Sequence, residues 1–231
     1  FPASEYQFGR TYDRIVAITR SGTTTEVVEL LDRLGSATRS TVLTADAATP
    51  AAEKASDVIN LTMATEHSVV QTRFPTTVLA LFRASLGENL DAVIDSARSA
   101  VTCPLPVEPG AERQITFLGL GWAAGIADEA GLKCREAAGA WTESYPAMEY
   151  RHGPISVSSE GTAVWVFGPS PVGLADDVAG TGARFVNDDL DPMVDLIRAQ
   201  RLAVELAGIN GRDPDRPLSL SFSVILEPGR S

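Results

Sequence analysis

The sequence predicts an α/β fold with two successive subdomains, each built on a doubly wound parallel sheet. Three observations predict it: buried-type apolar runs alternate with helical patterns, turns rich in Gly, Ser or Pro join them, and a nine-residue segment occurs twice. Strands that alternate with helices imply right-handed crossovers and parallel pairing, with helices on both faces of the sheet. We therefore expect a three-layer α/β/α arrangement in each subdomain.

The repeated segment opens the chain. Residues 1–9 read FPASEYQFG and residues 145–153 read YPAMEYRHG, so both follow the pattern aromatic-Pro-Ala-x-Glu-Tyr-x-x-Gly. A strand pattern and then a turn follow each copy, with the strands expected at 14–19 and 163–167. A chance match is the alternative, but the same order of following elements favours duplication.

The second copy is also preceded by a strand and a helix. A short apolar run at 115–118 leads through Gly119-Leu120-Gly121 into a helical pattern over 123–138. The first copy has no such unit before it, so we expect the first subdomain to lack its opening strand and helix. A proline-containing linker near residue 105 separates subdomains of 1–104 and 105–231.

The remaining elements alternate along the chain. Helical patterns cover residues 24–34, 72–83, 86–100 and 193–207, and strand-like runs cover 41–43, 58–61 and 184–186.

Composition narrows the class of partner. The net charge of −11 argues against nucleic acid or an anionic membrane as the main partner. No apolar run approaches the roughly 20 residues that span a bilayer, and the start shows no signal-peptide pattern. Cys103 and Cys134 form neither a metal-binding spacing nor a disulfide framework. We expect a cytoplasmic protein without a cofactor or a metal.

The turn after the first strand is the candidate anion site. Between the strand and the next helix lies Thr19-Arg20-Ser21-Gly22-Thr23-Thr24. Such a turn points unpaired backbone N–H groups outward at the positive end of a helix, which suits a phosphate. Its hydroxyls can donate hydrogen bonds, its arginine can add a charge-assisted one, and its glycine permits close approach.

The alternative is a connection whose Ser and Thr only cap the helix. Position favours the phosphate site, since ligands in open α/β sheets bind at the carboxyl ends of the strands. The corresponding turn of the second copy, Gly168-Pro169-Ser170-Pro171, has almost no hydroxyls. Only the first repeat is therefore expected to bind phosphate.

This turn resembles the Ser-x-Ser-Gly-x-Thr signature of the sugar isomerase (SIS) family. The chain is also similar, in order and over nearly its whole length, to the isomerase half of glucosamine-6-phosphate synthase and to amino-sugar phosphate deaminase/isomerase proteins. Further matches lie at residues 117–121, 131–136, 143–145 and 151–154. The resemblance implies two SIS subdomains, a phosphorylated sugar as ligand, and a homodimer.

Catalytic roles follow from the same resemblance. Glu129, Lys133 and Glu136 share a helix face by spacing, for which a solvated stripe is the alternative. In the family, the position of Glu136 holds the base that moves a proton between C1 and C2 of the open-chain sugar, and Lys133 matches a neighbouring active-site lysine. A single carboxylate can carry out this transfer through an enediol.

Three more residues are assigned by the resemblance. His152 matches a histidine that opens the sugar ring from across a dimer interface, with a surface histidine as the alternative. Val69 and Thr72 match a loop that lines the same pocket in relatives. The leading prediction is therefore an isomerase of a hexose or hexosamine 6-phosphate, with or without deamination. A non-catalytic SIS module that senses a sugar phosphate is the alternative.

One residue argues against a particular relative. In glucosamine-6-phosphate synthase a lysine near the C-terminus forms a Schiff base with the ketose, and Phe222 occupies the matching place here. A phenyl ring has no amine and cannot form an imine.

Overall fold

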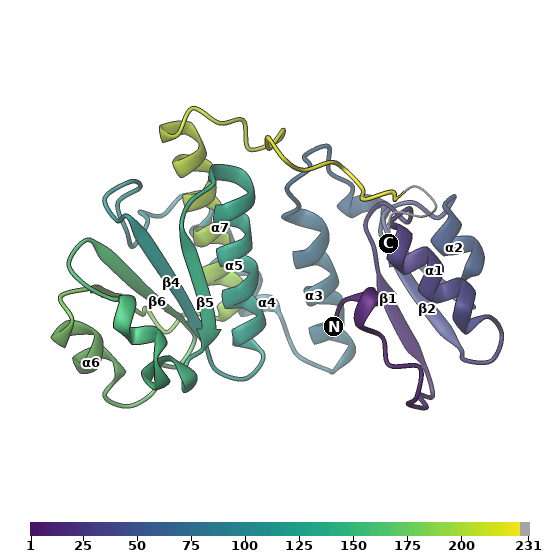
Figure 1. The fold of residues 1–231 in the computed structure, drawn as a ribbon, viewed down its shortest axis with the longest axis horizontal. Coiled ribbons are helices and arrows are strands. Elements are labelled where there is room, and N and C mark those ends of the chain that lie inside the picture. The colour runs from purple at the N-terminus through teal and green to yellow at the C-terminus, as the bar shows by residue number, and fades with distance from the viewer. Residues whose placement is uncertain (227–231) are drawn as a thin grey trace. The chain divides into compact units, whose positions relative to one another are not determined.

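The computed structural model describes residues 1–226 and divides the chain into two compact units. One unit comprises Phe1–Phe82 together with the described residues from Ser221 onward, and the other comprises Arg83–Leu220. Each unit contains one parallel sheet (Figure 1). The predicted α/β class with parallel sheets is confirmed.

The first unit is built on a three-stranded parallel sheet in the order β1-β2-β3. Its strands are β1 (Ile15–Ile18), β2 (Ser40–Thr44) and β3 (Asp57–Asn60). The central strand β2 reads STVLT and is buried throughout, as expected for a strand covered on both faces.

Helices cover both faces of this sheet. On one face, Val42 packs in a cluster with residues of α1 (Thr25–Leu34) and α2 (Pro50–Lys54). On the other face, Leu43 packs with Phe74 and Val78 of α3 (Arg73–Ser85). Neighbouring residues of a strand point to opposite faces of the sheet, so the adjacent side chains of Val42 and Leu43 pack against different helices.

The second unit has a four-stranded parallel sheet in the order β5-β4-β6-β7. Its strands are β4 (Gln114–Gly119), β5 (Thr142–Pro146), β6 (Thr162–Phe167) and β7 (Arg184–Val186). In this sheet β5 lies on one side of β4 and β6 lies on the other. The connection from β4 to β5 and the connection from β5 to β6 therefore run in opposite directions across the sheet.

The central strand β6 again supplies both faces. Val164 and Val166 pack in a cluster with Leu174 and Val178 of α6 (Leu174–Gly180). Trp165 points the other way, and its indole nitrogen bonds to Asp195 of α7 (Pro192–Ile209). The remaining helices of this unit are α4 (Asp91–Ala100) and α5 (Ala123–Ala138), both of which pack against α7.

Most predicted elements are confirmed within one or two residues, but the helix expected over 86–100 is wrong at its start. Gly87 adopts a φ of +86°, and the amide of Glu88 bonds to the Arg83 carbonyl, so the chain turns there. The side chain of Asn89 accepts a 2.8 Å bond from the Asp91 amide, where α4 begins. Sequence patterns also missed three short elements: α2, β5 and α6.

The contact-defined units do not coincide with the predicted subdomains 1–104 and 105–231. Arg201 of α7 donates hydrogen bonds to the carbonyls of Ala100 (2.9 Å) and Cys103 (2.6 Å), which ties the end of α4 to the second unit. The units are defined by contacts between residues, whereas the predicted subdomains are defined by the sequence repeat. The boundary near residue 105 therefore stays a prediction. Between residues 1 and 226, no helix is long and apolar enough to cross a membrane.

Candidate functional site: a hydroxyl-rich turn and a buried lysine

The turn from Thr19 to Thr24 lies at the carboxyl end of β1, as predicted. The Thr19 amide donates to the Leu43 carbonyl (3.0 Å), which extends the strand ladder into the turn. Thr24 is the N-cap of α1, but its side chain makes no capping hydrogen bond. Its hydroxyl lies 3.4 Å from that of Thr19 instead. Helix capping alone therefore does not account for these two threonines.

Gly22 is required by packing as well as by conformation. It has a φ of +65°, and a Cβ built on it would lie 2.1 Å from the Thr49 hydroxyl oxygen. Its carbonyl accepts a 3.0 Å bond from the amide of Ala51 in α2. The glycine thus lets the turn rest directly on the start of α2, a reason that the sequence does not reveal.

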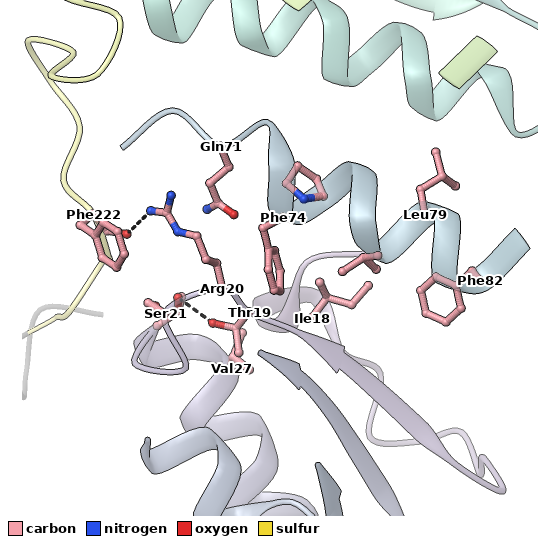
Figure 2. Close-up of a pocket in the computed structure, with 13 residues that line it drawn as sticks. Ile18, Thr19, Arg20, Ser21, Val27, Gln71, Phe74, Leu79, Phe82 and Phe222 are labelled. Atoms are coloured by element: carbon pink, nitrogen blue, oxygen red, sulfur yellow. Dashed lines mark hydrogen bonds between the residues drawn. The ribbon is translucent and has the colours of Figure 1, made fainter. Parts of the chain in front are cut away.

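Arg20 is buried and bonds to other parts of the same unit. One terminal nitrogen of its guanidinium donates to the Ser68 carbonyl (2.6 Å), and the other donates to the Phe222 carbonyl (3.2 Å). Its Cζ lies 3.9 Å from the centre of the Phe222 ring, a cation–π distance. Figure 2 shows the guanidinium pointing toward Phe222. Arg20 therefore joins the turn to the loop after β3 and to the C-terminal segment.

Two turn hydroxyls meet a third that sequence analysis had missed. Those of Ser21 and Thr23 donate to the Ser223 Oγ at 3.1 and 2.9 Å. In this part of the chain, the sequence singles out only Phe222. A serine next to that position is too common a signal to identify a partner of the turn.

A cavity of about 450 Å³ opens beside the turn (Figure 2). Its polar lining comes from the turn itself and from Gln71, and its apolar lining comes mainly from β1 and α3. The lining residues are Ile18, Thr19, Arg20, Ser21, Thr24, Val27, Gln71, Phe74, Pro75, Val78, Leu79, Phe82 and Phe222.

The predicted pocket residues Val69 and Thr72 are not among the residues that line this cavity. Gln71, which lies between them in the sequence, is. Thr72 has a clear local partner: its amide and hydroxyl donate to a Glu66 carboxylate oxygen at 2.9 and 3.3 Å. The amides of Arg73 and Phe74 donate to the same carboxylate. Glu66 therefore caps the start of α3, and this organises the loop.

In the second unit, Glu129, Lys133 and Glu136 do share one face of α5. The Lys133 side chain is only 5% exposed; its ammonium group pairs with Glu136 and lies 3.5 Å from a Glu129 oxygen. A solvated stripe is therefore wrong for Lys133. Glu136 also lines a cavity of about 250 Å³ together with Arg135, Arg212 and residues 217–220.

His152 and Cys134 of the second unit differ in their exposure to solvent. His152 is exposed at the end of a 3₁₀ turn, Glu149–His152. Cys134, next to Lys133, is fully buried, and burial raises the pKa of its thiol to about 12. A thiol with this pKa stays protonated at neutral pH, and burial makes a cysteine unreactive.

Sequence comparison finds that the chain is similar to glutamine–fructose-6-phosphate aminotransferases. The chain is 31% identical over 148 residues to the glutamine–fructose-6-phosphate aminotransferase (isomerizing) of Tropheryma whipplei, covering 50% of this chain and 24% of the relative. It is 28% identical to that of Xylella fastidiosa, covering 97% of this chain and 46% of the relative. The chain thus spans less than half the length of these relatives. No protein-family model matches it.

Solved structures share the fold. A glucosamine-6-phosphate deaminase from Thermotoga maritima superposes with a TM-score of 0.82 at 23% identity, over 97% of this chain and 81% of the other. At this identity the match concerns the arrangement of helices and strands.

Proposed function

We propose that the chain, which is similar to part of glutamine–fructose-6-phosphate aminotransferase (isomerizing), is an SIS-family protein that isomerises a phosphorylated sugar. The substrate we propose is a hexose or hexosamine 6-phosphate, whose aldose and ketose forms the protein would interconvert, with deamination in the case of an amino sugar. A cytoplasmic setting is part of the same proposal.

One observation carries the proposal: hydroxyl groups gather at the N-terminus of α1, beside a cavity of about 450 Å³. Thr19, Ser21 and Thr24 all line that cavity. Hydroxyl donors and the positive end of a ten-residue helix together suit a phosphate dianion. The absence of a lysine after the turn separates it from nucleotide P-loops.

We propose that Glu136 is the proton-transfer base. Its carboxylate would remove the proton from C2 of the open-chain aldose and return it to C1 through the enediol. Lys133 supports this role, since its buried ammonium group pairs with the carboxylate and holds it in place. We propose that His152 opens the sugar ring, and its exposure is compatible with reaching the pocket of a second copy.

The alternative is a module that binds a sugar phosphate without converting it. The same ion pair favours this alternative, because Lys133 occupies the carboxylate that would have to contact the sugar. Phe222 argues instead against a glucosamine-6-phosphate synthase activity, since it excludes imine chemistry at that place.

Deuterium exchange at C2 of a hexose 6-phosphate separates the two functions. An isomerase incorporates solvent deuterium at C2, whereas a binding module shifts the unfolding temperature without exchange. Glu136→Gln keeps the shape of the side chain and removes the base, so exchange should fall about 10²-fold or more with binding retained. Glu129→Gln is the matched control on the same helix face, and it should keep most of the exchange. Exchange that survives Glu136→Gln would assign the base to another residue.

Complementation tests the proposed homodimer with shared sites. Chains carrying His152→Ala and chains carrying Glu136→Gln should each be inactive alone. If one site uses residues from both chains, mixed dimers should recover part of the activity. If mixed dimers form but stay inactive, the proposal of a shared site is wrong. Either one chain supplies both residues to its own site, or one of the two residues has no role in catalysis.

A further inference from the structure

The C-terminal segment 221–226, here called the tail, presents oxygen atoms to the donors of the phosphate turn. The Ser223 Oγ accepts from the hydroxyls of Ser21 and Thr23. The Val224 carbonyl accepts a 3.1 Å bond from the amide of Thr25. The Phe222 carbonyl accepts from the Arg20 guanidinium, the contact drawn in Figure 2. Four donors of the turn and the first helical residue thus face three tail oxygens.

These are donors that an anion would use. The Thr25 amide belongs to the first residue of α1, and the first four N–H groups of a helix have no partner within the helix. The hydroxyls of Ser21 and Thr23 come from the turn that leads into the same helix end. An oxygen atom held by two hydroxyl donors occupies the kind of position that a phosphate oxygen takes. The tail therefore fills part of the anion site with neutral oxygens.

Little apolar burial holds the tail in this place. Phe222, Val224 and Ile225 are 46%, 50% and 70% exposed, although each has a large apolar side chain. The Leu226 amide also donates a 2.8 Å hydrogen bond to the Thr25 hydroxyl. A segment held by exposed polar contacts and few buried apolar ones opens at a low free-energy cost.

We propose that the tail is an internal competitor for the phosphate turn and that the phosphate of the ligand displaces Ser223 when it binds. The proposal rests on the proposed function, because it takes the turn to be the phosphate site. The charge of the phosphate favours displacement of Ser223. A dianion accepts charge-assisted hydrogen bonds from the same donors, whereas the serine hydroxyl accepts neutral ones. Phosphate ligands would bind the chain less tightly than they would bind an unoccupied turn, and ligands with further contacts would displace the tail more completely.

Binding of inorganic phosphate to the full chain tests the competition. Ser223→Ala removes the oxygen that faces Ser21 and Thr23, which lowers the fraction of chains whose turn is occupied. Apparent affinity for phosphate rises as that fraction falls, so we expect binding to tighten three- to tenfold by titration calorimetry. Ser36→Ala, an exposed serine of the same unit outside the tail, is the matched control and should leave affinity unchanged.

Hydrogen exchange of the tail gives a second readout of opposite sign for the two roles that Ser223 can have. If phosphate displaces the tail, the amides of residues 223–226 should exchange faster with phosphate present. If Ser223 is instead an additional phosphate ligand, these amides should exchange more slowly and Ser223→Ala should weaken binding. Either of the latter results overturns the competition.

A third variant separates failure of this inference from failure of the proposed function. Ser21→Ala/Thr24→Ala should weaken phosphate binding in both the parent and the Ser223→Ala background. Where that holds but Ser223→Ala leaves affinity unchanged, the turn binds phosphate and the tail does not compete. Should none of these variants alter phosphate binding, the turn is not the site and both proposals fall.

Discussion

The indole nitrogen of Trp165 donates a 2.7 Å hydrogen bond to the carboxylate of Asp195, and both side chains are buried. The second carboxylate oxygen lies 3.1 Å from the guanidinium of Arg198, which also pairs with Asp188 at 2.6 Å. Burial nevertheless raises the pKa of Asp195 from 3.8 to about 6, against the effect of both partners. The core of the second unit therefore holds a carboxyl that titrates in an accessible pH range.

This titration predicts a pH dependence of stability. Between pH 3.8 and about 6 the folded state holds a proton on Asp195 that the unfolded state has lost. The free energy of unfolding should therefore fall as the pH rises through this window, by about 3 kcal/mol at most, and then level off. Urea unfolding followed by tryptophan fluorescence measures it, because all three tryptophans, at 122, 141 and 165, lie in the second unit.

Asp195→Asn isolates the contribution of this carboxyl. The amide oxygen can still accept from Trp165, and Arg198 keeps Asp188. The variant should lose the decline between pH 4 and 6 that the parent shows. Equal slopes for parent and variant would mean that Asp195 titrates normally in the folded state.

Gly22→Ala should destabilise the first unit. The new Cβ would meet the Thr49 side chain at 2.1 Å, and the φ of +65° is unfavourable for alanine. We expect a loss of about 2–4 kcal/mol in thermal unfolding, together with loss of phosphate binding. Gly121→Ala is the control for conformation alone, because its φ is +56° with no atom within 4 Å of the new Cβ. A loss no larger than that of the control would mean that Thr49 moves aside at little cost.

Ser21→Ala/Thr24→Ala should lower the affinity for a hexose 6-phosphate by at least tenfold while the fold survives. Each hydroxyl is a donor to a dianion, and hydrogen bonds to charged groups contribute about 1.5–3 kcal/mol each. A thermal-shift titration measures it, with Ser36→Ala as the control because Ser36 is an exposed serine of the same unit. Unchanged affinity in the double variant would move the site elsewhere.

Borohydride should trap no sugar adduct in the presence of fructose 6-phosphate. The chain has two lysines, Lys54 and Lys133. The ammonium group of Lys54 pairs with Asp32, and that of Lys133 pairs with Glu136. An amine engaged in an ion pair is less available to attack a carbonyl. Mass spectrometry of tryptic peptides checks the outcome, and a reduced hexose adduct on Lys133 would show that an imine route exists without a lysine at position 222.

Regular elements were predictable where periodicity was strong. The 123–138 helix matches α5 to the residue, because its apolar and small residues recur at helical spacing over four turns and a glycine in the left-handed conformation, Gly139, ends it. Short elements were not predictable: β5 reads TESYP, is half-exposed, and lacks an apolar run. Its strand conformation comes from pairing with β4.

The sequence by itself determined the parallel α/β class, the hydroxyl-rich turn between β1 and α1, and the common helix face of Glu129, Lys133 and Glu136. These depend on spacings within a single element or on its direct connection to the next. Only the tertiary structure decided that Arg20 bonds to Ser68 and Phe222, that Gly22 rests on Thr49, and that Ser223 faces Ser21. Each of these contacts joins residues at least 27 positions apart, and their approach depends on how the sheet, its helices and the tail pack, which no local pattern encodes.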